Sequence, residues 1–133
     1  MKHLRSMLSV LINAHILMAC REYNVKKCLY SSSACVYPVY AQNSIKTASA
    51  QALKESDALP AEPEDGYGWE KLFSEVLSEY FYQDFGIEPR ICRYHNVYGP
   101  FGTWDGGREK VPAAICRKVI QAKLSGEHTI DIW

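Results

Sequence analysis

Three features that identify large classes of proteins are missing from this sequence. No run of apolar residues approaches the ~20 needed to span a bilayer, because Asn13, His15 and Arg21 interrupt the most apolar region. The same interruptions argue against a secretory signal peptide. The 15 basic residues balance the 15 acidic ones, and a neutral chain has little electrostatic attraction to nucleic acid. We therefore expect a cytoplasmic protein that binds neither membranes nor nucleic acid.

Cysteine pairs are missing too. The five cysteines are odd in number and none has a Cys-x-x-Cys spacing: Cys20, Cys28, Cys35, Cys92 and Cys116. This pattern argues against a disulfide framework and a zinc site, so no metal is expected. Four of them lie in apolar periodic segments, where reduced thiols usually pack in a core. Cys35 differs, because it follows a run of serines that closes a hydrophobic segment.

The apolar residues alternate between helical and strand patterns. Period-3.6 patterns predict helices at 4–23, 66–85 and 111–123, and short apolar runs predict strands at 26–33 and 87–94. This order predicts an α/β fold in which a right-handed connection joins two parallel strands. In such sheets ligands bind at the carboxyl ends of the strands.

Local signals set the limits of the second helix and of the loops. Asp65 is expected to cap this helix and Gly86 to end it. Residues 38–65 are polar and contain prolines, so they are expected to form a loop, and residues 129–133 are interpreted as the start of a strand. The apolar face predicted for the second helix consists of Leu72, Phe73, Val76, Leu77, Tyr80 and Phe81.

The glycine turn that binds a dinucleotide is also absent from this sequence. No Gly-x-x-Gly-x-x-Gly run lies between a strand and a helix, and the glycines of the 98–110 loop follow the second strand instead. Two strands make a small sheet, and the 26–33 strand would expose a hydrophobic edge. We infer that residues 1–133 form part of a Rossmann-like doubly wound domain that lacks its amino-terminal glycine-rich half.

Tyr67 and Lys71 lie one helical turn apart on the same face. A phenol is a poor base at neutral pH, because its ordinary pKa is ~10, but a fixed neighbouring cation favours the phenolate. Ser33, at the end of the first strand, could relay the proton. These three residues indicate hydride-transfer chemistry on an alcohol.

Three motifs resemble the extended short-chain dehydrogenase/reductase superfamily, which includes the NAD-dependent epimerases and dehydratases of nucleotide sugars. They are Ser-Ser-Ala-x-Val-Tyr at 32–37, Tyr-Gly-x-x-Lys at 67–71 and Arg-x-x-Asn-x-Tyr-Gly-Pro at 93–100. Three longer stretches, at 32–38, 53–63 and 99–114, resemble the GDP-mannose 3,5-epimerase branch. The resemblance covers the middle of a family member, without the carboxy-terminal substrate part.

The resemblance implies an epimerisation that passes through a ketone. C4 of the mannosyl ring of GDP-mannose is oxidised with NAD as hydride acceptor, with Tyr67 as the base and Lys71 and Ser33 assisting. Cys35 and Lys110 match the acid/base pair that inverts C3 and C5, after which C4 is reduced again. The expected product is GDP-L-galactose, and no net redox change occurs.

The resemblance also implies a set of binding residues and a partner. Tyr67 and Lys71 are expected to contact NAD. A homodimer is expected through the helices at 4–23 and 66–85. The positions that match substrate contacts are Ser33, Ala34, Cys35, Asn96, Glu109, Lys110, Val111 and Lys118.

The chemistry of Cys35 and Lys110 suits this role independently. Proton transfer next to a ketone needs groups that titrate near the working pH. The pKa of a thiol is ordinarily ~8.5, and a nearby cation lowers it. The pKa of an amine is ordinarily ~10.4, and desolvation lowers it. Ordinary 4-epimerases of the superfamily tend to carry a hydroxyl residue at the Cys35 position, so Cys35 separates the branches.

Two alternatives remain open at this point. The chain could belong to another nucleotide-sugar 4-epimerase or dehydratase, or be a truncated product without catalytic activity. Because the pyrophosphate-binding turn is absent from the sequence, residues 1–133 alone are predicted to be inactive.

Overall fold

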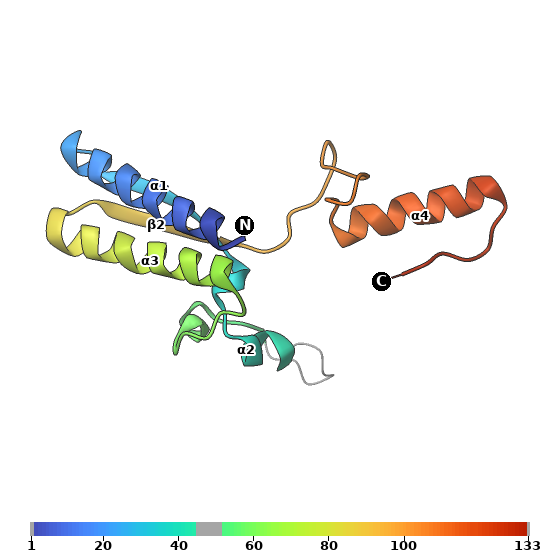
Figure 1. Cartoon of the computed structure of the whole chain (residues 1–133), viewed down its shortest axis with the longest axis horizontal. Coiled ribbons are helices and arrows are strands. Elements are labelled where there is room, and N and C mark those ends of the chain that lie inside the picture. The colour runs from blue at the N-terminus through green and yellow to red at the C-terminus, as the bar shows by residue number, and fades with distance from the viewer. Residues whose placement is uncertain (1, 45–51, 133) are drawn as a thin grey trace. The chain divides into compact units, whose positions relative to one another are not determined.

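The computed structural model describes residues 2–44 and 52–132, which fall into two units divided after His95 (Figure 1). The second unit contains one helix, α4 (Val111–Ser125). The first unit contains α1 (Lys2–Glu22), β1 (Lys27–Ser33), α2 (Val39–Ser44), α3 (Gly66–Phe85) and β2 (Glu88–Tyr94), with 3-10 turns η1 (Ala34–Val36) and η2 (Glu55–Ala58). No described helix is long and apolar enough to cross a membrane.

The two strands of the first unit are parallel, as predicted. Their register runs from Lys27 opposite Glu88 to Ser33 opposite Tyr94. Helix α3 connects them, and α1 packs against α3 (Figure 1). The α/β class with a parallel sheet is therefore confirmed, and both strand carboxyl ends lie at one edge of the sheet.

The ends of α3 follow from its local sequence. The Asp65 carboxylate accepts hydrogen bonds from the backbone N–H groups of Tyr67 and Gly68, both at 3.0 Å. This satisfies two of the four N–H groups that a helix start leaves unpaired. At the other end Gly86 adopts the left-handed conformation, with φ 69°, that glycine tolerates without strain. The predicted limits, 66–85, are confirmed.

The segment 38–65 is more ordered than the sequence indicated. It contains α2 and η2, and its buried Ala58 joins Val36, Tyr37 and Leu72 in the core of the first unit. The prediction of a plain loop was wrong, because a few apolar residues among many polar ones suffice to dock a short turn on a helix. Residues 45–51 lie outside the described part of the chain.

The buried face of α3 differs from the predicted apolar face. Phe73, Val76 and Tyr80 are 51 %, 37 % and 56 % exposed. The residues that α3 buries are instead mostly small or polar: Gly68, Glu70, Leu72, Ser74, Glu75 and Ser78. Small side chains allow α1 and the sheet to approach α3 closely, and this geometry overrides the hydrophobic pattern.

Serine hydroxyls on this face are satisfied within the first unit. Ser74 Oγ donates to the Glu70 carbonyl at 2.9 Å and accepts from Asn13 Nδ2 of α1 at 3.0 Å. Ser78 Oγ donates to the Ser74 carbonyl at 2.8 Å. These two serines can therefore be buried without the cost of unpaired hydroxyls.

The predicted strand after α4 does not form in the described residues. Residues 129–132 have no strand partner, and residue 133 lies outside the described part. Helix α4 itself begins at Val111, as predicted, with Pro112 in its first turn, and it ends two residues later than expected.

A buried ion pair joins the elements of the first unit. Arg93 on β2 donates through Nη2 to Glu75 Oε2 of α3 at 2.8 Å and through Nε to both carboxylate oxygens. Its Nη1 donates to the Glu55 carbonyl of η2 at 2.6 Å, and Ser32 Oγ of β1 donates to Glu75 Oε1. The hydrogen bonds that Arg93 donates to Glu75 raise the pKa of Arg93 above its ordinary value. The Glu75–Arg93 pair thus links both strands, α3 and η2.

We expect Arg93→Met to destabilise the first unit by about 3 kcal/mol, because it leaves the Glu75 carboxylate buried without its charged partner. Urea unfolding followed by circular dichroism measures this loss. Arg90→Met is the matched control: Arg90 lies on the same strand, but its ion pair with Glu88 is exposed, so no measurable change is expected. Equal effects of the two substitutions would contradict the central role of the buried pair.

Candidate functional site

The carboxyl end of β1 presents Ser33 and Cys35. Ser33 ends the strand and caps η1, where its Oγ accepts a hydrogen bond from the Cys35 backbone N–H at 3.2 Å. This turn places Ala34 and Cys35 directly after the strand, and Cys35 is exposed. The thiol is therefore accessible at the sheet edge where the sequence predicted chemistry.

The Tyr67–Lys71 pair forms as the helical spacing predicted. Lys71 Nζ lies 5.6 Å from the centre of the Tyr67 ring, and Tyr67 is 44 % exposed. The ammonium also donates a hydrogen bond to the Ser31 carbonyl at 2.9 Å. This bond fixes the side chain to β1, two residues before Ser33, so the structure brings all these groups to one region of the first unit.

Glu70 is a charged neighbour that sequence reasoning missed. Its side chain is 3 % exposed, and its Oε1 lies 3.8 Å from Lys71 Nζ. This oxygen has no hydrogen-bond partner among the described residues, so the contact is an ion pair without a hydrogen bond. A glutamate beside a lysine on a helix is usually solvated, and nothing in the sequence signalled that this one is buried.

Gly68 is a second residue that the sequence did not single out for a role. A Cβ at this position would overlap the Cys35 carbonyl oxygen and would lie 2.8 Å from Pro63 Cβ. The first turn of α3 can therefore approach η1 only because residue 68 has no side chain. The presence of a glycine inside the Tyr67–Lys71 motif was the sequence signal that could have predicted this close approach.

Tyr30 of β1 also lies near the lysine, with its ring centre 5.1 Å from Lys71 Nζ. Burial raises the pKa of Tyr30 to about 12, and the negative charges of Glu70 and Glu75 add to this effect, while a hydrogen bond with Ser74 opposes it. The phenol is thus held neutral, as part of the wall that surrounds the ammonium.

The other predicted site residues belong to the second unit. Lys110 is the N-cap of α4 and is exposed, and Val111 follows it. Lys118 Nζ donates to the Asp131 carbonyl, and Glu109 Oε1 accepts from Arg117 Nη2 at 2.9 Å. Asn96, the first residue of this unit, is exposed. The pairing of Cys35 with Lys110 spans both units and stays a prediction.

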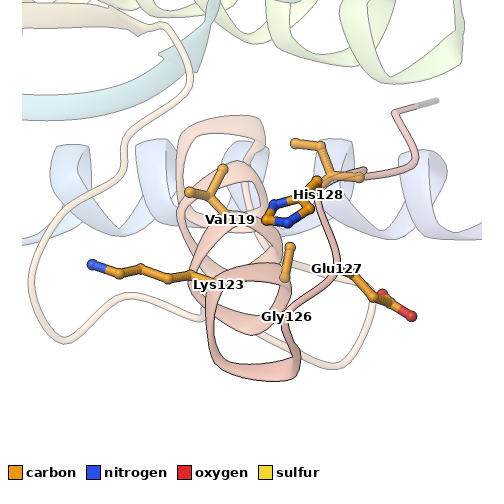
Figure 2. A pocket seen from close by; sticks show the side chains of 7 residues that line it. Val119, Lys123, Gly126, Glu127 and His128 are labelled. Carbon is orange, nitrogen blue, oxygen red and sulfur yellow. The ribbon is translucent and has the colours of Figure 1, made fainter.

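The second unit also has a shallow hollow of about 370 Å³ between α4 and the segment that follows it. Val119, Lys123, Gly126, Glu127 and His128 line it (Figure 2). A helix of the length of α4 spans about 22 Å, and the hollow lies toward its carboxyl end, whereas Lys110 is at its start. This hollow is therefore separate from the candidate acid/base residue.

Comparisons with known proteins agree on one family. Residues 6–133 match the model of the NAD dependent epimerase/dehydratase family. The chain is 54 % identical over 110 residues to GDP-mannose 3,5-epimerase of Arabidopsis thaliana, a match that covers 83 % of this chain and 28 % of that protein. The chain therefore spans little more than a quarter of the length of this curated relative.

Solved structures support the fold. UDP-N-acetylglucosamine 4-epimerase from Methanobrevibacter ruminantium is similar with a TM-score of 0.64 and 29 % identity, over 86 % of this chain and 33 % of that one. The NADP-bound GDP-mannoheptose C4 reductase MlghC from Campylobacter jejuni gives a TM-score of 0.70 at 24 % identity, over 87 % and 33 %. The second likeness concerns the fold alone.

We expect Gly68→Ala to destabilise the chain by roughly 1–3 kcal/mol, since the added methyl group forces α3 away from η1. The rate at which Cys35 reacts with an aromatic disulfide reagent should change with it. Gln83→Ala, at an exposed position of the same helix, is the control and should alter neither measurement. An unchanged stability and thiol reactivity in Gly68→Ala would contradict the close approach.

The raised pKa of Tyr30 predicts a late alkaline transition. A raised pKa stabilises the fold below the ordinary value of ~10, and this contribution disappears as pH rises through about 12. Absorbance at 295 nm should therefore show one tyrosine that ionises last, together with unfolding. Tyr30→Phe should remove this transition, whereas Tyr82→Phe, at an exposed position of α3, should not. A late transition that survives Tyr30→Phe would refute the assignment.

Proposed function

The chain belongs to the NAD dependent epimerase/dehydratase family, and we propose that it carries the catalytic segment of a GDP-mannose 3,5-epimerase. One observation carries this proposal. Cys35, an exposed thiol, follows the β1 end in the turn against which the helix of Tyr67 and Lys71 packs. The identity of 54 % over 110 residues to the Arabidopsis enzyme supports the same conclusion.

The first proposed step is oxidation of the C4 hydroxyl of the mannosyl ring. Tyr67 takes the hydroxyl proton, and Ser33 relays it. The ammonium of Lys71, held by the Ser31 carbonyl at 2.9 Å, stabilises the phenolate. The family uses NAD, which when bound would supply reversible hydride transfer at C4, so the cycle would leave the redox state unchanged.

The second proposed step is inversion at C3 and C5. A ketone at C4 acidifies the C–H bonds on both neighbouring carbons. One member of the Cys35–Lys110 pair removes a proton from one face of the ring and the other donates a proton to the opposite face. Inversion of both carbons converts GDP-mannose to GDP-L-galactose. Asn96, Glu109, Val111 and Lys118 are proposed to contact the substrate.

The residues present suit only one end of the cofactor. Lys71, whose amine is bound by the Ser31 carbonyl, is proposed to contact a cofactor ribose, and Tyr67 beside it is 44 % exposed. The glycine turn that would bind the pyrophosphate is not in this sequence. We therefore propose that residues 1–133 are a partial domain that does not retain NAD by itself.

The helices of the first unit suit the proposed homodimer. Both α1 and α3 expose large apolar side chains, which a helix pair in solution normally covers. They include Leu8, Leu11 and Ile12 on α1, and Phe73, Val76 and Tyr80 on α3. The proposed location of the assembly is the cytoplasm.

A different nucleotide-sugar 4-epimerase or dehydratase is the second candidate. The likeness to UDP-N-acetylglucosamine 4-epimerase, at 29 % identity, favours it. Such an enzyme needs Tyr67 and Lys71 but has no use for a thiol at position 35. The two candidates therefore differ in what they require of Cys35.

Residues 1–133, mixed with NAD and GDP-mannose in D₂O, should incorporate no deuterium at C3 or C5, because the pyrophosphate-binding turn is missing. The same residues should support incorporation once they replace the matching segment of the Arabidopsis enzyme. Proton NMR of the recovered sugar measures both. Incorporation by the isolated chain would refute the proposed inactivity, and an inert chimera would count against the proposed function.

In that chimera, Cys35→Ser should lower the rate of deuterium uptake at C3 and C5 by roughly 100-fold or more, because one member of the acid/base pair is lost. Oxidation of C4 should persist. Oxidation is followed by NADH absorbance under single-turnover conditions. Cys116→Ser, which changes another exposed cysteine, is the matched control and should leave uptake intact. If Cys35→Ser retains nearly full turnover, the second candidate is correct instead.

A further inference from the structure

Arg117 of α4 reaches back to the loop that precedes its helix. Its Nε donates to the Trp104 carbonyl at 3.1 Å, and its Nη2 donates to Glu109 Oε1 at 2.9 Å. Nη1 donates to Gln121 Oε1 at 3.2 Å, and Asp105 Oδ1 lies 3.5 Å from Nε. The side chains of Arg117 and Glu109 are only 19 % and 10 % exposed. One guanidinium thus holds both ends of the 104–109 segment.

The segment between these contacts contains two glycines in the left-handed region. Gly106 and Gly107 adopt positive φ values of 90° and 79°, which glycine reaches without strain. A Cβ built at either position would meet nothing within 4 Å, so the described residues leave open space beside both glycines. Its shape depends on the anchors at Trp104 and Glu109.

Lys110 follows Glu109 directly and immediately precedes α4. It is the N-cap residue, but its side chain makes no capping hydrogen bond. Its backbone is therefore fixed by the helix on one side and by Glu109 on the other. We propose that Arg117 is a positioning residue: by anchoring Trp104 and Glu109 it fixes where Lys110 presents its amine.

The importance of this position rests on the proposed function, in which Lys110 transfers a proton at the sugar ring. Proton transfer fails when the acid or base lies about 1 Å from its productive place, and rates then fall as much as 100-fold. Loss of the residue that fixes the loop should therefore slow the proposed proton transfer through the position of Lys110.

The contact requires an arginine. A planar guanidinium can donate to the Trp104 carbonyl and the Glu109 carboxylate at the same time, whereas the single ammonium of a lysine cannot match this geometry. Backbone N–H groups of Glu109 and Gly107, together with Arg117, hold the pKa of the Glu109 carboxyl below its ordinary value. Because this pKa is lowered, the contact between Arg117 and Glu109 is fully formed at pH values above the ordinary pKa of a glutamate. It is lost as the pH falls through the lowered pKa of Glu109.

Hydrogen exchange and carboxyl NMR on the 133-residue chain test the proposal. Arg117→Lys and Arg117→Met should each speed exchange of the Gly106, Gly107 and Glu109 amides by about tenfold, with little change in the middle of α4. The Glu109 carboxyl should titrate closer to its ordinary value in both variants. Lys123→Met, an exposed position on the same helix, is the control. If Arg117→Met unfolds α4, Glu109→Gln weakens the same contact from the loop side and should show the same local exchange.

The outcomes separate this inference from the proposed function. Unchanged loop exchange and an unchanged Glu109 titration in both Arg117 variants would overturn the positioning role, whatever the chimera does. Full rescue of both measurements by lysine would overturn it too, because a simple charge would then suffice. The deuterium assay on the chimera, in contrast, reports on the epimerase activity itself.

Discussion

The first unit depends on the buried ion pair between Glu75 and Arg93. A carboxylate that is 5 % exposed must be paired to be tolerated. The partners that satisfy it come from both strands, and Arg93 extends the network to the Glu55 carbonyl of η2. Because Ser32 takes part, the network ends one residue before Ser33. The pair therefore fixes the end of β1, from which the candidate site is built.

The close approach of α3 to β1 and η1 positions the remaining residues of the candidate site. Gly68 lets the first turn of α3 touch the Cys35 carbonyl, and the Ser31 carbonyl holds the Lys71 ammonium. These contacts involve backbone atoms of β1 and η1. A side-chain substitution in β1 or η1 does not remove these backbone atoms. The second unit uses a different device, in which Arg117 anchors a glycine turn by hydrogen bonds. Both arrangements support the proposed chemistry by holding the reacting side chains on fixed backbone.

Much of the fold could be predicted because its signals are local. Asp65, Gly86 and Pro112 set helix limits through capping and dihedral preferences, and short apolar runs indicated both strands. The buried face of α3 could not be predicted, since a hydrophobic pattern marks Phe73 and Tyr80 as core residues although they are exposed. Likewise, nothing in the order of residues 53–61 showed that Ala58 would dock on Leu72.

The sequence by itself determined which side chains residues 1–133 offer to the proposed chemistry. The spacing of Tyr67 and Lys71, the serine run before Cys35 and the missing glycine turn are all properties of the order of residues. Only the tertiary structure decided which contacts form around these residues: the buried Glu70 beside Lys71, the Ser31 carbonyl, Gly68 against Cys35 and the reach of Arg117. The reason is physical, because burial and hydrogen bonding between residues distant in sequence depend on how elements pack, and local patterns do not encode that packing.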